Sequence, residues 1–364
     1  MRTVGVEEEF LLVDVRTGEL LPVAGELLRE TDDQITGEFL EQMIETRSRP
    51  HQGAAGLVAD LRDLRGEVAA RAARHGAAPA ALSTSPLPTH GVVRPVERYG
   101  RIVDAYGALA RQHLTCACHV HVEVADDEEG AVVLDGLREW LPTLLALSAG
   151  SPFAAGEETG YASYRWQLMA RWPSGGPPPV VRSAEGYRSL VDGLLETGVI
   201  LDRGGLYLDA RLSDHQSTVE VRVADVCPDL GVTVLLAVLV RALVETAAER
   251  GVVGADRPVP GDRPLADTTM LRAATWQASR AGLTGDLVHP DTGRLAPAEQ
   301  VLTDLVEHVR PGLAAAGDLA LVEEEVRRVL RRGGEASRQR EVLRRTGRLA
   351  DVVADVARLT VEGT

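Results

Sequence analysis

The segment TVGVEEEFLLVD at residues 3–14 has the character of a buried β-strand interrupted by three consecutive glutamates. Successive side chains of a strand point to opposite faces, so Glu7 and Glu9 share one face while Glu8 joins Phe10 on the other. Taken alone, glutamates on a strand usually indicate a solvated face. The valines and leucines on both sides argue against a fully exposed strand, because such residues are mostly buried. The segment therefore predicts a covered sheet with carboxylates on one face.

Size and composition indicate a globular protein without a nucleic-acid or membrane partner. The 364 residues allow one large domain or two ordinary ones. The formal net charge of -15 argues against nucleic acid, because its partners usually show a basic footprint. The longest apolar run, VTVLLAVLV at 232–240, is shorter than the ~18 residues of a membrane span. No signal-peptide region follows Met1, and three cysteines make no disulfide framework, which predicts a reduced cytoplasmic protein.

Strand patterns lie in the first two thirds of the chain, and helical periodicity dominates the rest. This order is typical of an α+β fold with a mainly antiparallel sheet and flanking helices. We expect one domain over 1–364, sheet-rich over 1–228 and helical over 229–364, with a loop or lid at 172–179. The expected strands are 3–13, 38–46, 79–84, 116–124, 205–212 and 217–224. The expected helices are 57–68, 96–112, 130–148, 185–196, 231–250, 268–281, 296–315 and 319–361, the last broken at Gly333-Gly334.

The segment CACHVHVEV at 116–124 resembles a zinc site in its spacing of cysteines and histidines. Strand alternation argues against that site, because Cys116 and Cys118 face one way while His119, His121 and Glu123 face the other. The cysteines are then small core residues, which is common for free cysteine. Two histidines beside a carboxylate are as consistent with ligands as with structural residues.

Two further strand segments carry charge on one face. In STVEVRVAD at 217–225, Glu220 and Arg222 alternate with valines, and in MIETR at 43–47, Glu45 and Arg47 share a face. Each pair alone is also explained by a cross-strand charge pattern. On neighbouring antiparallel strands, these groups would form an acidic surface whose repulsion requires cations. Magnesium ions that also bind substrate phosphates suit such a surface, although neither a Walker A motif nor GxGxxG is present.

Taken in order, these segments resemble the glutamate–cysteine ligase type 2 family of carboxylate–amine ligases. The resemblance implies a glutamine-synthetase-like catalytic fold that binds ATP and two or three Mg²⁺ ions. It also implies phosphorylation of a substrate carboxylate, with glutamate as the expected donor, and amide formation with cysteine or another amine. The segments that carry it are VGVEEEFLLVD, MIETR, CHVHVEV, SPFAAGEETGYASYRWQLMARWP and TVEVRVADV and, more weakly, LRAATWQASRAGL and GGEASRQR.

The resemblance also implies roles for individual residues. Arg222 would meet the transferring phosphoryl group beside Glu220, and Arg165 would hold a substrate carboxylate through its guanidinium fork. Tyr164 and His121 join Arg165 as expected substrate-binding residues, with Arg171 and Arg280 as weaker candidates. The implied metal ligands are Glu7, Glu9, Glu45, His119 and Glu220.

Some features leave alternatives open. The family pattern has Asn before SPF and an aromatic residue after it, whereas this chain has Gly150 and Ala154, which predicts a pocket for an amine larger than cysteine if the loop borders the substrates. The basic run 327–348 is most simply a solvated helix face, with a nucleotide lid or a subunit contact as alternatives. The sequence leaves open whether the protein forms a homodimer. A metal-dependent hydrolase and a non-catalytic nucleotide- or amino-acid-binding homologue are the competing functions.

Overall fold

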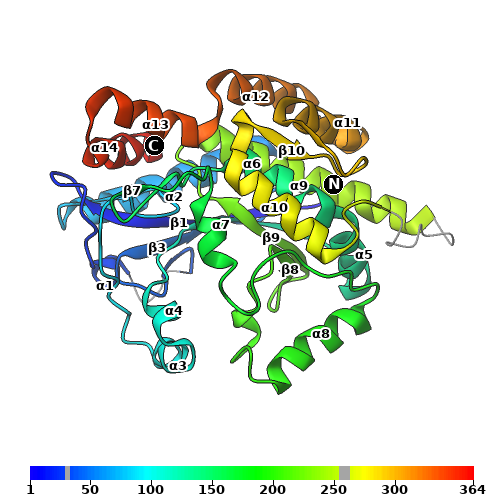
Figure 1. Ribbon diagram of the computed structural model, residues 1–364, viewed down its shortest axis with the longest axis horizontal. Helices are drawn as coiled ribbons and strands as arrows, with labels where there is room; N and C mark the ends of the chain where they lie inside the picture. The colour runs from blue at the N-terminus through cyan, green and yellow to red at the C-terminus, as the bar shows by residue number, and fades with distance from the viewer. Residues whose placement is uncertain (29–32, 254–262) are drawn as a thin grey trace.

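The computed structural model describes residues 1–28, 33–253 and 263–364. Its main sheet has the strands β1 (Val4–Asp14), β2 (Ile35–Gly37), β3 (Met43–Arg47), β4 (Ala77–Ala80), β5 (Ala117–Glu123), β8 (Ala210–Leu212) and β9 (Thr218–Asp225). Their order is β2-β3-β1-β5-β9-β8, with β4 also pairing β1 (Figure 1). Every pairing in this sheet is antiparallel, which confirms the predicted fold class.

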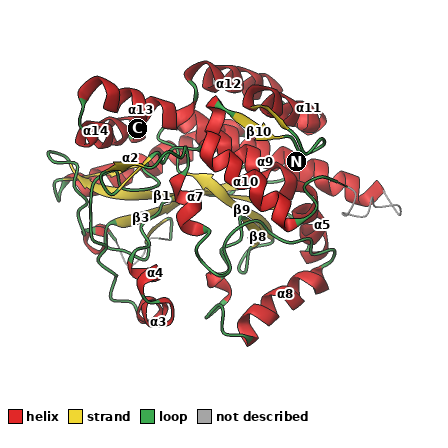
Figure 2. Cartoon of the chain, viewed as in Figure 1, coloured by secondary structure: helices red, strands yellow, loops and turns green. Residues whose placement is uncertain are grey.

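Helices cover the two faces of the sheet differently (Figure 2). Helices α2, α6, α9 and α14 contact its strands, and we call the side where α9 lies the rear face. We call the opposite face, which points downward in Figure 1, the front face. There α3 and α8 extend away from the sheet and leave a gap between them. The helices are α1 (Ala24–Leu27), α2 (Ala54–Ala73), α3 (Glu97–Tyr106), α4 (Ala108–Arg111), α5 (Asp127–Leu137), α6 (Leu141–Ser148), α7 (Tyr164–Met169), α8 (Ala184–Glu196), α9 (Leu230–Val253), α10 (Thr268–Ala281), α11 (Ala298–Ala316), α12 (Leu319–Arg332), α13 (Gly334–Thr346) and α14 (Leu349–Thr360).

The rear face of the sheet packs into the hydrophobic core, and Glu8 is buried there. Val6, Val120 and Val221 pack there with the apolar residues of α9. Glu8 is 0% exposed and accepts hydrogen bonds from Arg65 Nε at 2.9 Å and Arg65 Nη2 at 2.5 Å. The two-residue period predicted from the sequence is therefore confirmed for Glu8, which faces away from Glu7 and Glu9.

Helix α9 explains the longest apolar stretch of the chain. Its segment Leu230–Gly251 has a mean hydropathy of 2.0 and is long and apolar enough to cross a membrane. Counting only the uninterrupted apolar run 232–240 underestimated the length of the apolar segment. Isolated polar residues interrupt the run without making the helix polar. In the structure, 72% of its most apolar window is buried inside the protein, so packing behind the sheet accounts for this composition.

The structure corrects several expected boundaries. Of the segment expected as one strand at 38–46, only 43–46 is extended, as part of β3. Residues 38–42 form the turn that joins β3 to the earlier strand β2, which explains why the alternation was imperfect. The region after 230 is not wholly helical, because β10 (Asp286–Val288) and β11 (Leu295–Pro297) form a hairpin. The predicted helix break at Gly333-Gly334 is confirmed, and a second break occurs at Gly347, whose left-handed φ of 71° suits glycine. Another hairpin pairs β6 (Phe153–Ala154) with β7 (Glu157–Glu158).

Candidate active site

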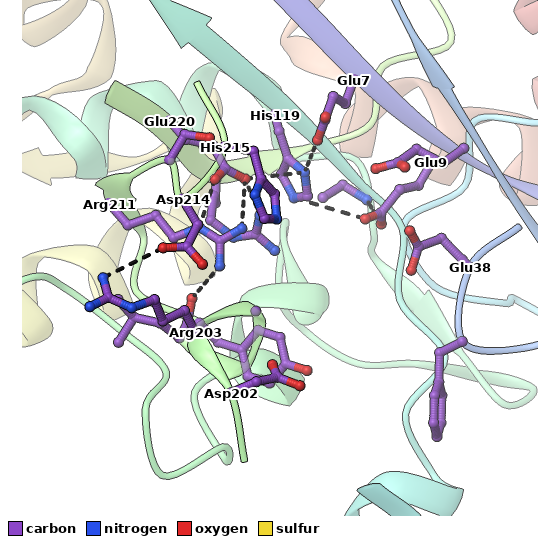
Figure 3. Close-up of a pocket in the computed structure, with 18 of the residues that line it drawn as sticks. Glu7, Glu9, Glu38, His119, Asp202, Arg203, Arg211, Asp214, His215 and Glu220 are labelled. Atoms are coloured by element: carbon purple, nitrogen blue, oxygen red, sulfur yellow. Dashed lines mark hydrogen bonds and ion pairs between the residues drawn. The ribbon is translucent and has the colours of Figure 1, made fainter. Parts of the chain in front are cut away.

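A cavity of about 960 Å³ opens on the front face of the sheet. Its floor consists of front-face side chains of β1, β3, β5, β8 and β9, and its walls come from α3, α8 and the loops near them. The predicted residues that line it are Glu7, Glu9, Glu45, His119, His121, Arg165, Glu220 and Arg222. Figure 3 shows several of these side chains converging from separate strands.

Strand register places the acidic and imidazole side chains next to each other. Glu9 pairs with Glu45 across β1 and β3, and Glu7 pairs with His119 across β1 and β5. On the other side of β5, His121 pairs with Glu220 of β9. Directly opposed residues on one sheet face are close enough to interact. Antiparallel pairing therefore gathers residues that are more than 200 positions apart in the sequence.

Three overlapping groups of these side chains could each hold a metal ion. In every group, one ligand atom from each residue lies within 4.8 Å of the others. Glu7 and Glu45 each belong to two of the groups, and His119 Nδ1 is 3.3 Å from Glu7 Oε2 and 3.8 Å from Glu220 Oε1. The groups are Glu7, Glu45 and His119; Glu7, His121 and Glu220; and Glu9, Glu38 and Glu45.

The all-carboxylate group has an electrostatic cost that a cation would remove. Burial and the neighbouring Glu38 raise the pKa of Glu9 to about 8. Burial, followed by Glu38 and Glu7, raises the pKa of Glu45 well above its usual range. Buried carboxylates that repel one another favour protonation unless positive charge is supplied. Their oxygen ligands suit hard divalent ions such as Mg²⁺.

The donor atoms of the other groups also fit a cation. Nε2 of His121 is buried, makes no hydrogen bond with any described residue, and lies 3.6 Å from Glu7 Oε2 and 3.9 Å from Glu220 Oε1. Its Nδ1 is 3.0 Å from Thr218 Oγ1, which fixes the ring. Burial and then Arg222 lower the pKa of His119 to about 4, so this imidazole is neutral near pH 7, as a metal ligand must be.

Arginines lie beside the acidic groups. Arg222 forms an ion pair with Glu220, and Arg211 Nε is 2.6 Å from the other oxygen of that carboxylate. Burial opposes ionisation of Glu220, but these guanidinium groups outweigh it and lower its pKa. On the opposite side, Arg47 Nη2 is 2.6 Å from Glu45 Oε2. The cavity thus combines ionised carboxylates with positive groups suited to phosphate oxygens.

An irregularity in strand pairing positions Arg165. The register between β5 and β9 shifts opposite His119, near Arg222 and Val223. Arg165 Nη1 and Nη2 donate to the carbonyl oxygens of Val223 and Arg222 at 3.2 and 3.1 Å. Its Nε is buried and has no hydrogen-bond partner among the described residues. A bulge that frees strand carbonyls therefore anchors this guanidinium at the cavity, and its Nε–H stays available to a ligand.

Three residues with expected substrate roles do not line this cavity. Tyr164 lies on α7 with its ring 5.9 Å from that of Tyr161, and Arg171 is exposed just beyond this helix. Arg280 donates to the carbonyl oxygen of Gly160 and stacks over Tyr161. The substrate roles of Tyr164, Arg171 and Arg280 stay predictions without support from cavity geometry.

Comparison with known proteins agrees with this geometry. Residues 3–355 match the model of a protein family described as Glutamate-cysteine ligase family 2 (GCS2). The chain belongs to glutamate–cysteine ligase family 2. A relative from Streptomyces coelicolor, provisionally named glutamate–cysteine ligase 2, is 46% identical over 99% of both chains. A relative from Frankia alni with the same kind of name is 42% identical over 99% of this chain and 97% of its own.

Solved structures show the same fold as this family 2 member. A glutamate–cysteine ligase from Francisella tularensis in complex with AMP has a TM-score of 0.72 at 15% identity and covers 99% of this chain and 88% of its own. A bifunctional glutathione synthetase from Pasteurella multocida has a TM-score of 0.73, also at 15% identity, over 99% of this chain and 52% of its own. Family membership supports a carboxylate–amine ligase, and the low identities show the fold alone.

Sequence reasoning missed several cavity residues of this family 2 ligase. Glu38 completes an acidic group, although it lies after β2 rather than on a strand. Arg211 stands on the three-residue strand β8, which is too short to show alternation. Its register opposite Glu220 could not be seen before the strand partners were known. The glutamate at the start of EFLEQMIETR was a usable signal, because its segment already contained Glu45.

Two other expectations change with the structure. Neither Gly150 nor Ala154 lines the cavity, so the missing loop side chains cannot enlarge the substrate pocket directly. A Cβ at Gly150 would lie 3.0 Å from Cγ of Glu335, which indicates that this glycine accommodates α13. The basic run 327–348 also lies outside the cavity lining, and three of its arginines, Arg328, Arg338 and Arg340, form ion pairs with acidic residues of other segments. These contacts favour a structural helix surface over a nucleotide lid.

Proposed function

We propose that this protein joins a carboxylate to an amine using ATP, with glutamate as the carboxylate donor and cysteine or another amine as the acceptor. The observation that carries the proposal is the set of three overlapping metal-ligand groups on one sheet face, flanked by Arg222 and Arg211 in a single cavity. Family membership and the AMP-bound fold relative support ATP as the nucleotide.

The proposed reaction has two steps whose atoms balance. A carboxylate oxygen of glutamate attacks the γ-phosphorus of ATP, and ADP leaves. The amine nitrogen then attacks the carbonyl carbon of the acyl phosphate, the carbon–oxygen bond to phosphate breaks, and inorganic phosphate and a proton are released. Phosphoryl transfer needs positioning and charge neutralisation more than covalent participation by the protein.

The cavity residues divide this work between them. Two or three Mg²⁺ ions, when bound, would neutralise and orient the phosphate oxygens. We assign their ligands to Glu7, Glu9, Glu45, His119 and Glu220. Arg222, held by its ion pair with Glu220, faces the transferring phosphoryl group. Arg165, which lines the cavity and whose Nε–H has no partner among the described residues, would bind the substrate carboxylate, and His121 lines the same cavity.

Trapping the activated carboxylate tests this proposal. The protein is incubated with ATP, Mg²⁺, glutamate and hydroxylamine, and glutamyl hydroxamate and ADP are measured together. We expect equal amounts of both products, because hydroxylamine replaces the amine in the second step. Omission of glutamate is the control. ADP formation without hydroxamate would contradict the proposal.

The competing functions give different results in the same assay. A metal-dependent hydrolase would cleave an amide substrate without nucleotide, for which acidic and histidine ligands also serve. A binding homologue would retain ATP without releasing ADP. The arginines beside Glu220 favour the ligase, because hydrolysis of an amide does not require groups that neutralise a polyphosphate.

A further inference from the structure

Aromatic side chains form a continuous wall on one side of the cavity. This aromatic wall consists of Phe39, Tyr99, His113, Trp172 and Tyr207, all of which line the cavity. The ring of Phe39 is 5.3 Å from that of Tyr99 and 6.5 Å from that of His113. Trp172 continues the wall, with its ring 5.1 Å from His113 and 5.0 Å from Tyr207. In a chain that is only 4% aromatic, this concentration indicates a specific surface.

The wall presents little charge to the cavity. Trp172 Nε1 donates to His113 Nδ1 at 3.2 Å, so the only polar group of the indole is already satisfied. Burial, followed by Arg165 and Arg171, lowers the pKa of His113 to about 4, and the ring is neutral near pH 7. Apolar side chains at the cavity extend this surface, namely Met43, Ile102 and Met169.

The aromatic wall adjoins, along the chain, two residues with proposed roles at the reacting carboxylate, Glu38 and Arg165. Phe39 directly follows Glu38, which belongs to the all-carboxylate group. Trp172 lies just after α7, the helix that begins at Tyr164 and carries Arg165. Arg203 and Arg211 lie with His215 on the other side, away from Glu9 and Glu38 (Figure 3). We assign the transferring phosphoryl group to the metal groups and Arg222, and the rest of the nucleotide to the side of Arg203 and Arg211. This leaves the aromatic wall for another substrate.

We propose that the aromatic wall binds the acceptor amine, and that this amine carries an aromatic ring or a similar flat apolar group. This inference rests on the proposed ligase function and specifies its acceptor. A ring against Tyr99 and Tyr207 would bury apolar surface and make edge or stacked contacts. Phe39 and Trp172 are buried within the wall. Tyr99 and Tyr207 are therefore the rings most open to a ligand, and the side chain of cysteine is too small to contact both. The bond formed is the amide between the glutamyl carbonyl carbon and the amine nitrogen, with phosphate as the leaving group.

An acceptor panel tests the proposed preference. Product formation is measured by mass spectrometry with 2-phenylethylamine, tyramine and phenylalanine, and with cysteine and alanine as small acceptors. We expect kcat/KM to be at least about tenfold higher for the best aromatic amine than for cysteine. Cysteine as the best acceptor in the panel would overturn the proposal.

Variants of the aromatic wall distinguish two possible ligands of this surface, the acceptor amine and the adenine ring of ATP. Tyr99→Leu and Tyr207→Leu keep apolar bulk and remove a ring. We expect kcat/KM for 2-phenylethylamine to fall about tenfold more than kcat/KM for hydroxylamine, with the KM for ATP changing less than about twofold. Trp276→Leu, which removes a 42% exposed ring outside the cavity, is the matched control. A raised KM for ATP with unchanged acceptor preference would assign the wall to adenine.

Direct binding separates failure of this inference from failure of the ligase proposal. Calorimetry measures 2-phenylethylamine binding to the wild-type protein and to Tyr99→Leu without nucleotide. If the wild type makes no hydroxamate, the ligase proposal fails, yet an affinity about tenfold weaker in the variant still supports the wall. Equal affinities, or no binding by the wild type, would overturn the inference.

Discussion

Glu8 on the rear face of β1 and its neighbours Glu7 and Glu9 on the front face differ in how their charges are satisfied. Glu8 lies against Arg65, whose guanidinium also donates to the carbonyl oxygens of Cys227, Pro228 and Thr360. The front-face carboxylates instead crowd against Glu38 and Glu45. The rear pair is complete within the protein, whereas we expect a cation to complete the front group.

This difference separates a structural role from a functional one within three consecutive residues. A buried ion pair with all its hydrogen bonds made holds segments together, and Arg65 links β1 to the ends of β9 and α14. Buried carboxylates that repel one another are concentrated at sites of binding or chemistry. The contrast predicts that front-face changes alter activity and rear-face changes alter stability.

The largest expected effect is on the rate of ADP formation. Glu220→Gln keeps the shape of the side chain but removes a charge that belongs to one metal-ligand group and pairs with two arginines. We expect ADP release to fall about a thousandfold, or ~4 kcal/mol in barrier, with circular dichroism unchanged. Glu123→Gln, at the exposed end of β5, is the control. An ADP rate within about threefold of wild type would break the front-face assignment.

The rear pair should show the opposite behaviour. Arg65→Met leaves the Glu8 carboxylate buried without its partner, and we expect the free energy of unfolding to fall by ~3–5 kcal/mol in urea titration. The double variant Glu8→Leu with Arg65→Met should recover most of this loss, because no unpaired charge remains. A single variant as stable as wild type would contradict a structural role for the pair.

A histidine at the cavity wall should make stability depend on pH. The pKa of His113 is lowered to about 4 from 6.5. As pH falls, His113 therefore gains a proton in the unfolded state before it does so in the folded state. The contribution of His113 to the free energy of unfolding is complete above about pH 6.5 and declines as pH falls toward 4. His113→Asn, which retains an acceptor for Trp172, should reduce this decline by an amount on the order of 3 kcal/mol. The exposed His90→Gln is the control, and identical pH profiles for wild type and His113→Asn would contradict the expectation.

The smallest expected effect is a gain in stability, whereas most substitutions reduce the free energy of unfolding. Glu38→Gln removes one of three crowded carboxylates, so the metal-free protein should gain about 1 kcal/mol in unfolding free energy. The same change should weaken Mg²⁺ binding, measured as a smaller rise in melting temperature with added Mg²⁺. Glu97→Gln, an exposed acid at the start of α3, should change neither quantity. A less stable metal-free Glu38→Gln protein would show that the front group is satisfied without a cation.

Strand alternation predicted much of the site before the structure. It assigned Glu7, Glu9, His119 and Glu220 to one face and placed Cys116 and Cys118 elsewhere, and both cysteines are indeed buried and outside the cavity. Alternation is a local property, so it can be read without knowing which strands are neighbours. The metal-ligand roles themselves stay predictions.

The remaining features depend on long-range contacts that local patterns do not contain. Glu38 approaches Glu9 only because β2 and β3 pair with each other and β3 pairs with β1. Arg211 meets Glu220 through the register of β8, and the bulge near Arg222 gives Arg165 its carbonyl partners. The aromatic wall combines five segments separated by up to 168 positions between Phe39 and Tyr207. Periodicity within any one segment could not reveal these arrangements.

The most direct test of the central claim follows the oxygen atoms of the substrate. Glutamate labelled with ¹⁸O in its side-chain carboxylate is incubated with the protein, ATP, Mg²⁺ and an accepted amine, and the released phosphate is analysed by mass spectrometry. If the front-face groups activate the carboxylate by phosphorylation, each phosphate carries one ¹⁸O atom, because the carbon–oxygen bond breaks when the amide forms. Phosphate without ¹⁸O, released at the same rate, would contradict the account.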